Sequence, residues 1–121
     1  MAIDPDRADL ERFRQGDTGR PVVLLQLLRF APGGRERYFA YAAAAQPILV
    51  RLGGQVLYAG EPGPPLVAGA EGWDGIVITR LPSRAVYLDM LADPQFQALA
   101  PQRRASLRET VLMPMDDWPS R

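Results

Sequence analysis

The sequence has 121 residues, of which 47% are hydrophobic and 23% charged, so one domain with a buried core is expected. Its formal net charge is zero, and all 14 basic residues are arginines. Histidine, cysteine, lysine and asparagine are absent, which excludes serine–histidine and cysteine nucleophile systems, Cys/His zinc sites and Schiff-base lysines.

The N-terminal segment predicts a short helix that lies outside the main domain. Asp4 is a good helix N-cap, and Pro5 suits the first helical position. The helix should end near Gly16, before a turn rich in glycine. We therefore assign residues 1–20 to this helix and its linker and residues 21–121 to the main domain.

A strand and a helix open the main domain. Residues 22–30 (VVLLQLLRF) are apolar on both faces of a strand, so both faces need a cover. Residues 35–52 predict an alanine-rich helix, which Pro47 should kink or shorten by its last turn. The pair Gly53-Gly54 suits a left-handed C-terminal cap.

Two further strands frame a loop rich in proline and glycine. Residues 55–59 make the second strand, and residues 74–81 (DGIVITRL) make another strand that is apolar on both faces. Within the loop, residues 66–68 (LVA) could return as a short hairpin partner.

The C-terminal third predicts helices followed by a last strand. Ser83 is a plausible N-cap of one helix, and Asp93 with the proline after it starts another that continues towards Leu107. Residues 110–115 (TVLMPM) form the last strand, in which Pro114 favours a sheet edge.

The element order after the first helix is βαββαβ, which predicts an α+β fold of the ferredoxin-like type. Such a fold has one antiparallel sheet with its helices on one face. The strands at 22–30 and 74–81 are apolar on both faces, so the other face also needs a cover. A second copy of the chain is the simplest cover, and we expect a homodimer with the architecture of a dimeric α/β barrel.

Several segments agree with a known family in order and spacing. They are VVLLQLLRF, RLGGQVLYAGE, Trp73-Asp74, LPSRAVYLDML and DPQFQALAPQRRASL. From about Pro21 to Met115 the chain resembles the DUF1330 family, which implies a dimeric α+β barrel and no established activity.

Two positions depart from the family pattern. Gln26 stands where relatives often have asparagine, and Gln102 stands where they often have histidine. An amide does not titrate, so a base carried over to position 102 is in doubt.

Two elements carry candidate binding residues. Gln26 is the single uncharged polar residue of its strand, and it either orients a ligand or is satisfied by neighbouring backbone. Tyr38 and Tyr41 are three residues apart and share a helix face. They either grip or protonate a ligand through their hydroxyls, or they pack in the core.

Further candidates surround the strand at 74–81. Trp73 could wall a pocket with Asp74 as a base, or these two residues could be a lid and a turn residue. Arg80 and Arg103 could clamp a carboxylate or enolate. Their structural alternative is an ion pair with one of the acidic residues Asp74, Asp89, Asp93 and Glu109.

These residues predict a small, mostly apolar pocket between sheet and helices. The leading hypothesis is a cofactor-independent enzyme for proton transfer, cyclisation or oxygenation of a hydrophobic enol, phenol or polyketide-like substrate. Asp74 and Tyr41 would be catalytic, and the other candidates would bind substrate. The alternative is a non-catalytic dimeric module that binds a metabolite or a protein.

The remaining predictions concern location and partners. The sequence has no basic stripe for nucleic acid and no apolar run of about 20 residues for a membrane span. The N-terminus lacks the apolar core of a signal peptide, so we expect a cytoplasmic protein. No metal site or cofactor is indicated.

Overall fold

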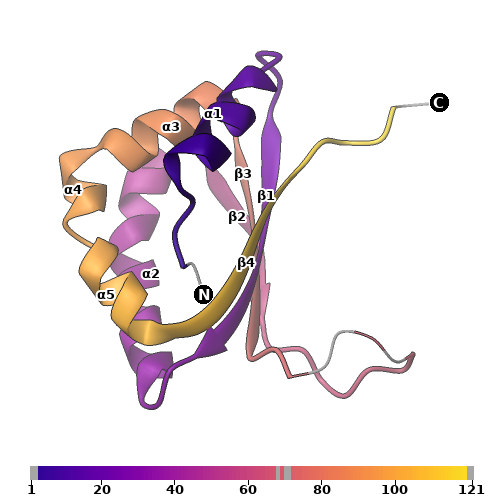
Figure 1. The fold of residues 1–121 in the computed structure, drawn as a ribbon, viewed down its shortest axis with the longest axis vertical. Helices are drawn as coiled ribbons and strands as arrows, with labels where there is room; N and C mark the ends of the chain where they lie inside the picture. The colour runs from indigo at the N-terminus through magenta and orange to yellow at the C-terminus, as the bar shows by residue number, and fades with distance from the viewer. Residues whose placement is uncertain (1–2, 68, 70–71, 120–121) are drawn as a thin grey trace.

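The computed structural model describes residues 3–67, 69 and 72–119, and in this part of the chain the helices cover one face of a four-stranded antiparallel sheet (Figure 1). The strand order is β2-β3-β1-β4, which confirms the predicted α+β, ferredoxin-like fold. In chain order the elements are α1 (Arg7–Gln15), β1 (Val22–Phe30), α2 (Gly34–Arg51), β2 (Gln55–Gly60), β3 (Gly75–Leu81), α3 (Arg84–Ala92), α4 (Pro94–Gln97), α5 (Ala100–Ser106) and β4 (Leu107–Met115).

Strand β1 lies between β3 and β4, and its register decides which residues face the helices. Gln26 lies opposite Val77 of β3 and Leu112 of β4. Side chains alternate along a strand, so the even-numbered residues of β1 share the helix-covered face and the odd-numbered residues point away. This explains why Leu24 and Leu28 are buried.

The core consists of two clusters between α2 and the sheet. One cluster includes Leu24, Ile48 and Leu81, and the other includes Leu28 and Tyr41. The buried positions of α2 recur at spacings of three and four residues, so one face of the helix lies on the sheet.

The helix α2 continues through Pro47 to Arg51, so its last turn is not split off. Gly53 has φ +85°, and its N–H donates to Val50 O at 3.0 Å, while the N–H of Gly54 donates to Leu49 O at 2.9 Å. This is the predicted left-handed C-terminal cap, in the form of a Schellman motif. Among the described residues, no helix combines the length and apolar character needed to cross a membrane.

The start of α1 differs from the prediction. The N-cap is Asp6 rather than Asp4, because Asp6 and Asp9 form a reciprocal capping box. The side chain of Asp6 accepts from Asp9 N at 2.7 Å. Two residues earlier, Asp4 is paired with arginines of α5 instead.

Two other boundaries also differ. Leu66 and Val67 are exposed and belong to no strand, so the expected hairpin partner is wrong there, and Ala68 lies outside the described residues. The helix expected from Asp93 towards Leu107 is divided into α4 and α5, and Leu107 already begins β4. Strand β4 is an edge strand, as Pro114 predicted.

Candidate functional site

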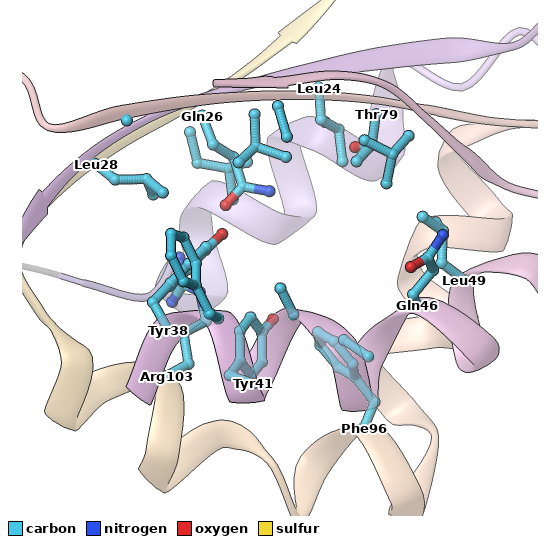
Figure 2. Close-up of a pocket in the computed structure, with 18 of the residues that line it drawn as sticks. Leu24, Gln26, Leu28, Tyr38, Tyr41, Gln46, Leu49, Thr79, Phe96 and Arg103 are labelled. Carbon is cyan, nitrogen blue, oxygen red and sulfur yellow. The ribbon is translucent and has the colours of Figure 1, made fainter. Parts of the chain in front are cut away.

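A cavity of about 1050 Å³ lies between the helix-facing side of the sheet and the helices (Figure 2). Aliphatic and aromatic side chains make up most of its wall. The polar side chains that line it include Gln26, Tyr38, Tyr41, Gln46, Thr79 and Arg103. The predicted pocket between sheet and helices is therefore present, although it is larger than the small pocket expected, and four of these six residues are among the predicted site residues.

Gln26 brings an amide into the roof of this cavity. It belongs to the helix-facing set of β1, and Figure 2 shows its side chain pointing from the sheet towards Tyr38 and Tyr41. The tyrosines come from α2, and their ring centroids are 5.5 Å apart. The register and the helix spacing together place these three polar groups at one end of the cavity.

The tyrosines are protonated donors at neutral pH. Tyr38 and Tyr41 are 5% and 7% exposed, and burial raises the pKa of both hydroxyls above the ordinary value. The charge of Arg103 opposes this increase in pKa only in part. A phenol in this state donates a hydrogen bond or a proton and is a poor base.

Tyr87 of α3 is a third phenol on the cavity wall that sequence reasoning missed. Burial raises its pKa to about 12, with Arg103 acting in the opposite direction. Its ring packs edge-on against Phe13 of α1, at a centroid distance of 5.6 Å. Nothing in the local pattern separates Tyr87 from an ordinary core residue, so the sequence carried no signal for it.

Arg103 is buried, with 8% of its surface exposed, and lines the cavity from α5. Its Nη1 donates to Asp4 Oδ1 at 2.7 Å and to Ile3 O at 3.1 Å. The neighbouring Arg104 donates to the other oxygen of Asp4 at 3.2 Å. The acidic partners expected from the sequence are therefore wrong, because the N-terminal segment supplies the carboxylate.

Asp74 lies at the mouth of the cavity and is exposed. Its Oδ2 accepts from Phe30 N at 2.9 Å, and its own N–H donates to Leu28 O at 2.8 Å. The residue thus continues the pairing of β1 and β3 by one step. Its carboxylate fixes the end of β1 and also reaches the rim of the cavity.

The structure does not bring Trp73 and Arg80 to the cavity. Arg80 lies opposite Val23, on the sheet face that points away from the helices, and its Nη1 is 3.8 Å from Asp117 Oδ2. Trp73 packs under the guanidinium of Arg29, which lies 4.2 Å from its ring centroid. Both residues belong to the outer side of the sheet.

The far end of the cavity carries two polar residues that were not predicted. Thr79 of β3 lies opposite Leu24 and shares its face, and Gln46 comes from α2 (Figure 2). The alternation of the strand at 74–81 would have placed Thr79 here. Among the described residues, no group of three or more acidic side chains could hold a metal ion.

The cavity therefore has an apolar body and one end that is rich in donors. This geometry can bind an oxygen atom of a ligand, and it can supply a proton from a neutral phenol.

Residues 28–115 match the family model described as a domain of unknown function, DUF1330. The chain belongs to this family. The resemblance stated from the sequence is thereby confirmed. No curated protein sequence matches the chain.

Solved structures extend the comparison. RPA0582 of Rhodopseudomonas palustris, a protein of unknown function, is 29% identical, with a TM-score of 0.87 and 98% of each chain covered. A hydroxynitrile lyase from Passiflora edulis is 15% identical, with a TM-score of 0.64, covering 84% of this chain and 99% of its own. A dimeric ferredoxin-like protein of unknown function from Jannaschia sp. CCS1 is 14% identical, with a TM-score of 0.65, covering 80% and 99%. The last two share the fold.

Proposed function

We propose that this DUF1330 protein binds a small, mostly apolar molecule through an acceptor oxygen, in the cavity between the sheet and α2. The observation that carries the proposal is a set of donors, two of them buried and one half-buried, at one end of a mostly apolar cavity. Tyr41, Gln26 and Arg103 all offer N–H or O–H groups there. Small-molecule sites typically combine such a wall with a few converging polar groups.

The size of the cavity also supports a small-molecule ligand. At about 1050 Å³ it lies just above the usual range of about 300–1,000 Å³ for such sites. Because Tyr38 and Tyr41 are buried, hydrogen bonds to their hydroxyls are stronger than they would be in water. A ligand oxygen at this end is therefore favoured over a ligand donor.

A matched pair of ligands tests the binding proposal. We expect 2-acetylnaphthalene, which carries a carbonyl oxygen, to bind more tightly than 2-ethylnaphthalene, which has none. In Tyr41→Phe the affinity for 2-acetylnaphthalene should fall by about fivefold, since one hydrogen bond contributes about 1 kcal/mol. Tyr58→Phe is the matched control, because Tyr58 is 54% exposed on β2. If neither ligand binds, as measured by calorimetry, the proposal is wrong.

The catalytic form of the proposal assigns Asp74 as the base and Tyr41 as the acid. Both residues line the same cavity, which favours this assignment. Asp74 would remove a proton next to a carbonyl group, and the Tyr41 hydroxyl would stabilise the enolate oxygen. A structure of the same fold is described as a hydroxynitrile lyase, so the fold includes an enzyme.

Proton transfer can be measured directly. In D2O we expect the protein to accelerate exchange of the methyl protons of 2-acetylnaphthalene, followed by NMR. Asp74→Asn should abolish the acceleration while ligand binding persists. Exchange no faster than in buffer alone would leave the non-catalytic binding module as the function.

We also propose that a second copy of the chain covers the outer sheet face. The outward residues of β1, β3 and β4 are mostly apolar: Val23, Leu25, Leu27, Ile76, Ile78, Val111 and Met113. An apolar face of this kind is typical of an interface. The description of a neighbour with the same fold as dimeric supports the proposal.

The test of the dimer is native mass spectrometry. Wild type should appear at twice the mass of one chain, and Ile78→Arg should appear as a monomer, because it places a charge in the centre of the outer face. Val50→Arg is the matched control and should remain dimeric, because Val50 lies on α2 with 58% of its surface exposed. A monomeric wild type would contradict the proposal.

A further inference from the structure

Residues 3–6, which precede α1, contribute to one side wall of the cavity. Asp4 and Pro5 line the cavity, and they also line a second space of about 460 Å³ next to it. This segment has no regular structure, and it reaches α5 through the contact of Asp4 with Arg103. The segment therefore belongs to the walls of both spaces, as does Tyr87.

At this wall, the chain's own Asp4 carboxylate is paired with Arg103, the buried cation of the cavity. Arg103 and Arg104 both donate to Asp4, so two guanidinium groups meet one carboxylate. The charge of Asp4 also adds to the increase in the pKa of Tyr41, and both residues line the cavity. Asp4 thus stands where the oxygen atoms of a bound ligand would be held.

Other charges on the cavity wall have partners of their own. Arg35 of α2 is paired with Glu61, and Asp74 accepts from Phe30 N. Both contacts lie within or next to the secondary structure of the main sheet and α2. The partner of Arg103 differs, because it comes from a segment outside any helix or strand.

We propose that the ligand is a small organic acid whose carboxylate replaces Asp4 on Arg103 while its apolar body fills the cavity. This inference rests on the proposed binding function. The exchange keeps the buried guanidinium paired with an anion, whereas moving Asp4 away without a replacement would leave a buried charge unpaired. A neutral ligand leaves Asp4 in place and gains no such partner.

The local structure allows the exchange. The helix α1 has its own capping box at Asp6, so Asp4 can leave Arg103 without unfolding α1. Arg104, with its side chain 52% exposed, can keep the released carboxylate at the surface. Ile3 packs against the second core cluster, so displacement of the segment lowers the apparent affinity of the acid.

The experiment compares 2-naphthoate with 2-naphthamide by calorimetry at fixed ionic strength. The two probes have nearly the same shape and differ in charge. We expect Asp4→Asn to raise the affinity for 2-naphthoate about tenfold, because the competing carboxylate is gone, and to change the affinity for 2-naphthamide less than about twofold. Arg103→Gln should remove the preference for 2-naphthoate. Arg37→Gln is the matched control and should keep it, because Arg37 is exposed on α2 and does not line the cavity.

The outcomes separate this inference from the function on which it rests. If 2-acetylnaphthalene and 2-naphthamide bind but Asp4→Asn leaves 2-naphthoate unchanged or weaker, the ligand is not an acid on Arg103, and the binding function stands. If none of the three probes binds, the binding function itself fails. Should Arg103→Gln not fold, Asp4→Asn still decides, because Asp4 is exposed and its replacement leaves α1 capped.

Discussion

Gly34 fixes the position of α2 against α5, and its substitution by alanine should be strongly destabilising. A Cβ added at Gly34 would lie 2.1 Å from the carbonyl oxygen of Ser106 and 2.9 Å from its carbonyl carbon. These are backbone atoms at the junction of α5 and β4, so they cannot rotate away. The contact sets the spacing between Tyr38 on α2 and Arg103 on α5.

The magnitude follows from this geometry. A separation of 2.1 Å from Ser106 O is more than 1 Å short of ordinary van der Waals contact, and Ser106 O accepts from Ala31 N at 3.0 Å. Losing that hydrogen bond costs about 1 kcal/mol, and overpacking costs about 1–3 kcal/mol. The free energy of unfolding should thus fall by about 2–4 kcal/mol. At about 4 °C per kcal/mol for a chain of this length, Tm should fall by about 8–16 °C.

Two other glycines separate the effect of space from the effect of backbone conformation. Gly33 has φ +71° with nothing within 4 Å of an added Cβ. In Gly33→Ala the free energy of unfolding should therefore fall only by the strain of alanine in the left-handed conformation, about 1–2 kcal/mol. Gly63 has open space and no positive φ, so Gly63→Ala should leave Tm unchanged.

The assay is thermal unfolding at one protein concentration, since a dimer would make Tm depend on concentration. A Tm of Gly34→Ala within about 2 °C of that of Gly63→Ala would refute the reasoning from the Ser106 contact.

Two further predictions concern the helix cap of α3 and the buried phenols. Ser83 Oγ accepts from Val86 N at 3.2 Å, so Ser83→Ala should lower the free energy of unfolding by about 1 kcal/mol in urea denaturation; an unchanged midpoint would show that the cap contributes nothing. Burial raises the pKa of Tyr38, Tyr41 and Tyr87 in the folded state, so these phenols ionise at a lower pH in the unfolded chain. The free energy of unfolding that they contribute is therefore fully present below pH ~10 and should be lost as the pH rises towards about 12. Absorbance at 295 nm should therefore rise in two stages, the second coinciding with loss of circular dichroism, and a single reversible rise for all tyrosines would contradict the burial.

Much of the fold could be predicted because local signals agree with the tertiary structure. The apolar run at 22–30 has both faces covered or apolar, and it became the central strand β1 with its predicted bounds. Ser83 and Gly53 marked helix ends through hydrogen bonds that span only a few residues. Such signals are contained within one turn of the chain, so the sequence displays them directly.

The predicted start of α1 was wrong because two residues, Asp4 and Asp6, are both candidates for its N-cap. Asp4 precedes a proline, which is a good local signal, but Asp6 and Asp9 satisfy each other's backbone N–H groups. The decision also depends on Arg103, about 100 residues away, which takes the carboxylate of Asp4. No pattern in the sequence reveals a contact of that range.

Strand alternation explains why some of the predicted site residues line the cavity and others lie on the opposite face of the sheet. Gln26 lies opposite Val77 and Leu112 and faces the cavity, whereas Arg80 lies opposite Val23 and faces away. The faces of β1 and β3 could be related only after the register was known, because a shift by one residue exchanges them. Candidate residues chosen by chemistry alone therefore fell on both sides of the sheet.

The two faces of β1 belong to different proposed sites, one to the ligand cavity and the other to the dimer interface. Gln26 lies in the wall of the cavity, and Leu25 and Leu27 lie on the face where we place a second copy of the chain. Substitutions at neighbouring positions of β1 can therefore test ligand binding and dimerisation separately. Gln26→Leu should weaken binding of 2-acetylnaphthalene while the dimer persists, and Leu25→Arg should give monomers. If a monomer still binds the ligand, the cavity is complete within one chain; if it does not, the second copy holds the sheet in the shape that binding requires.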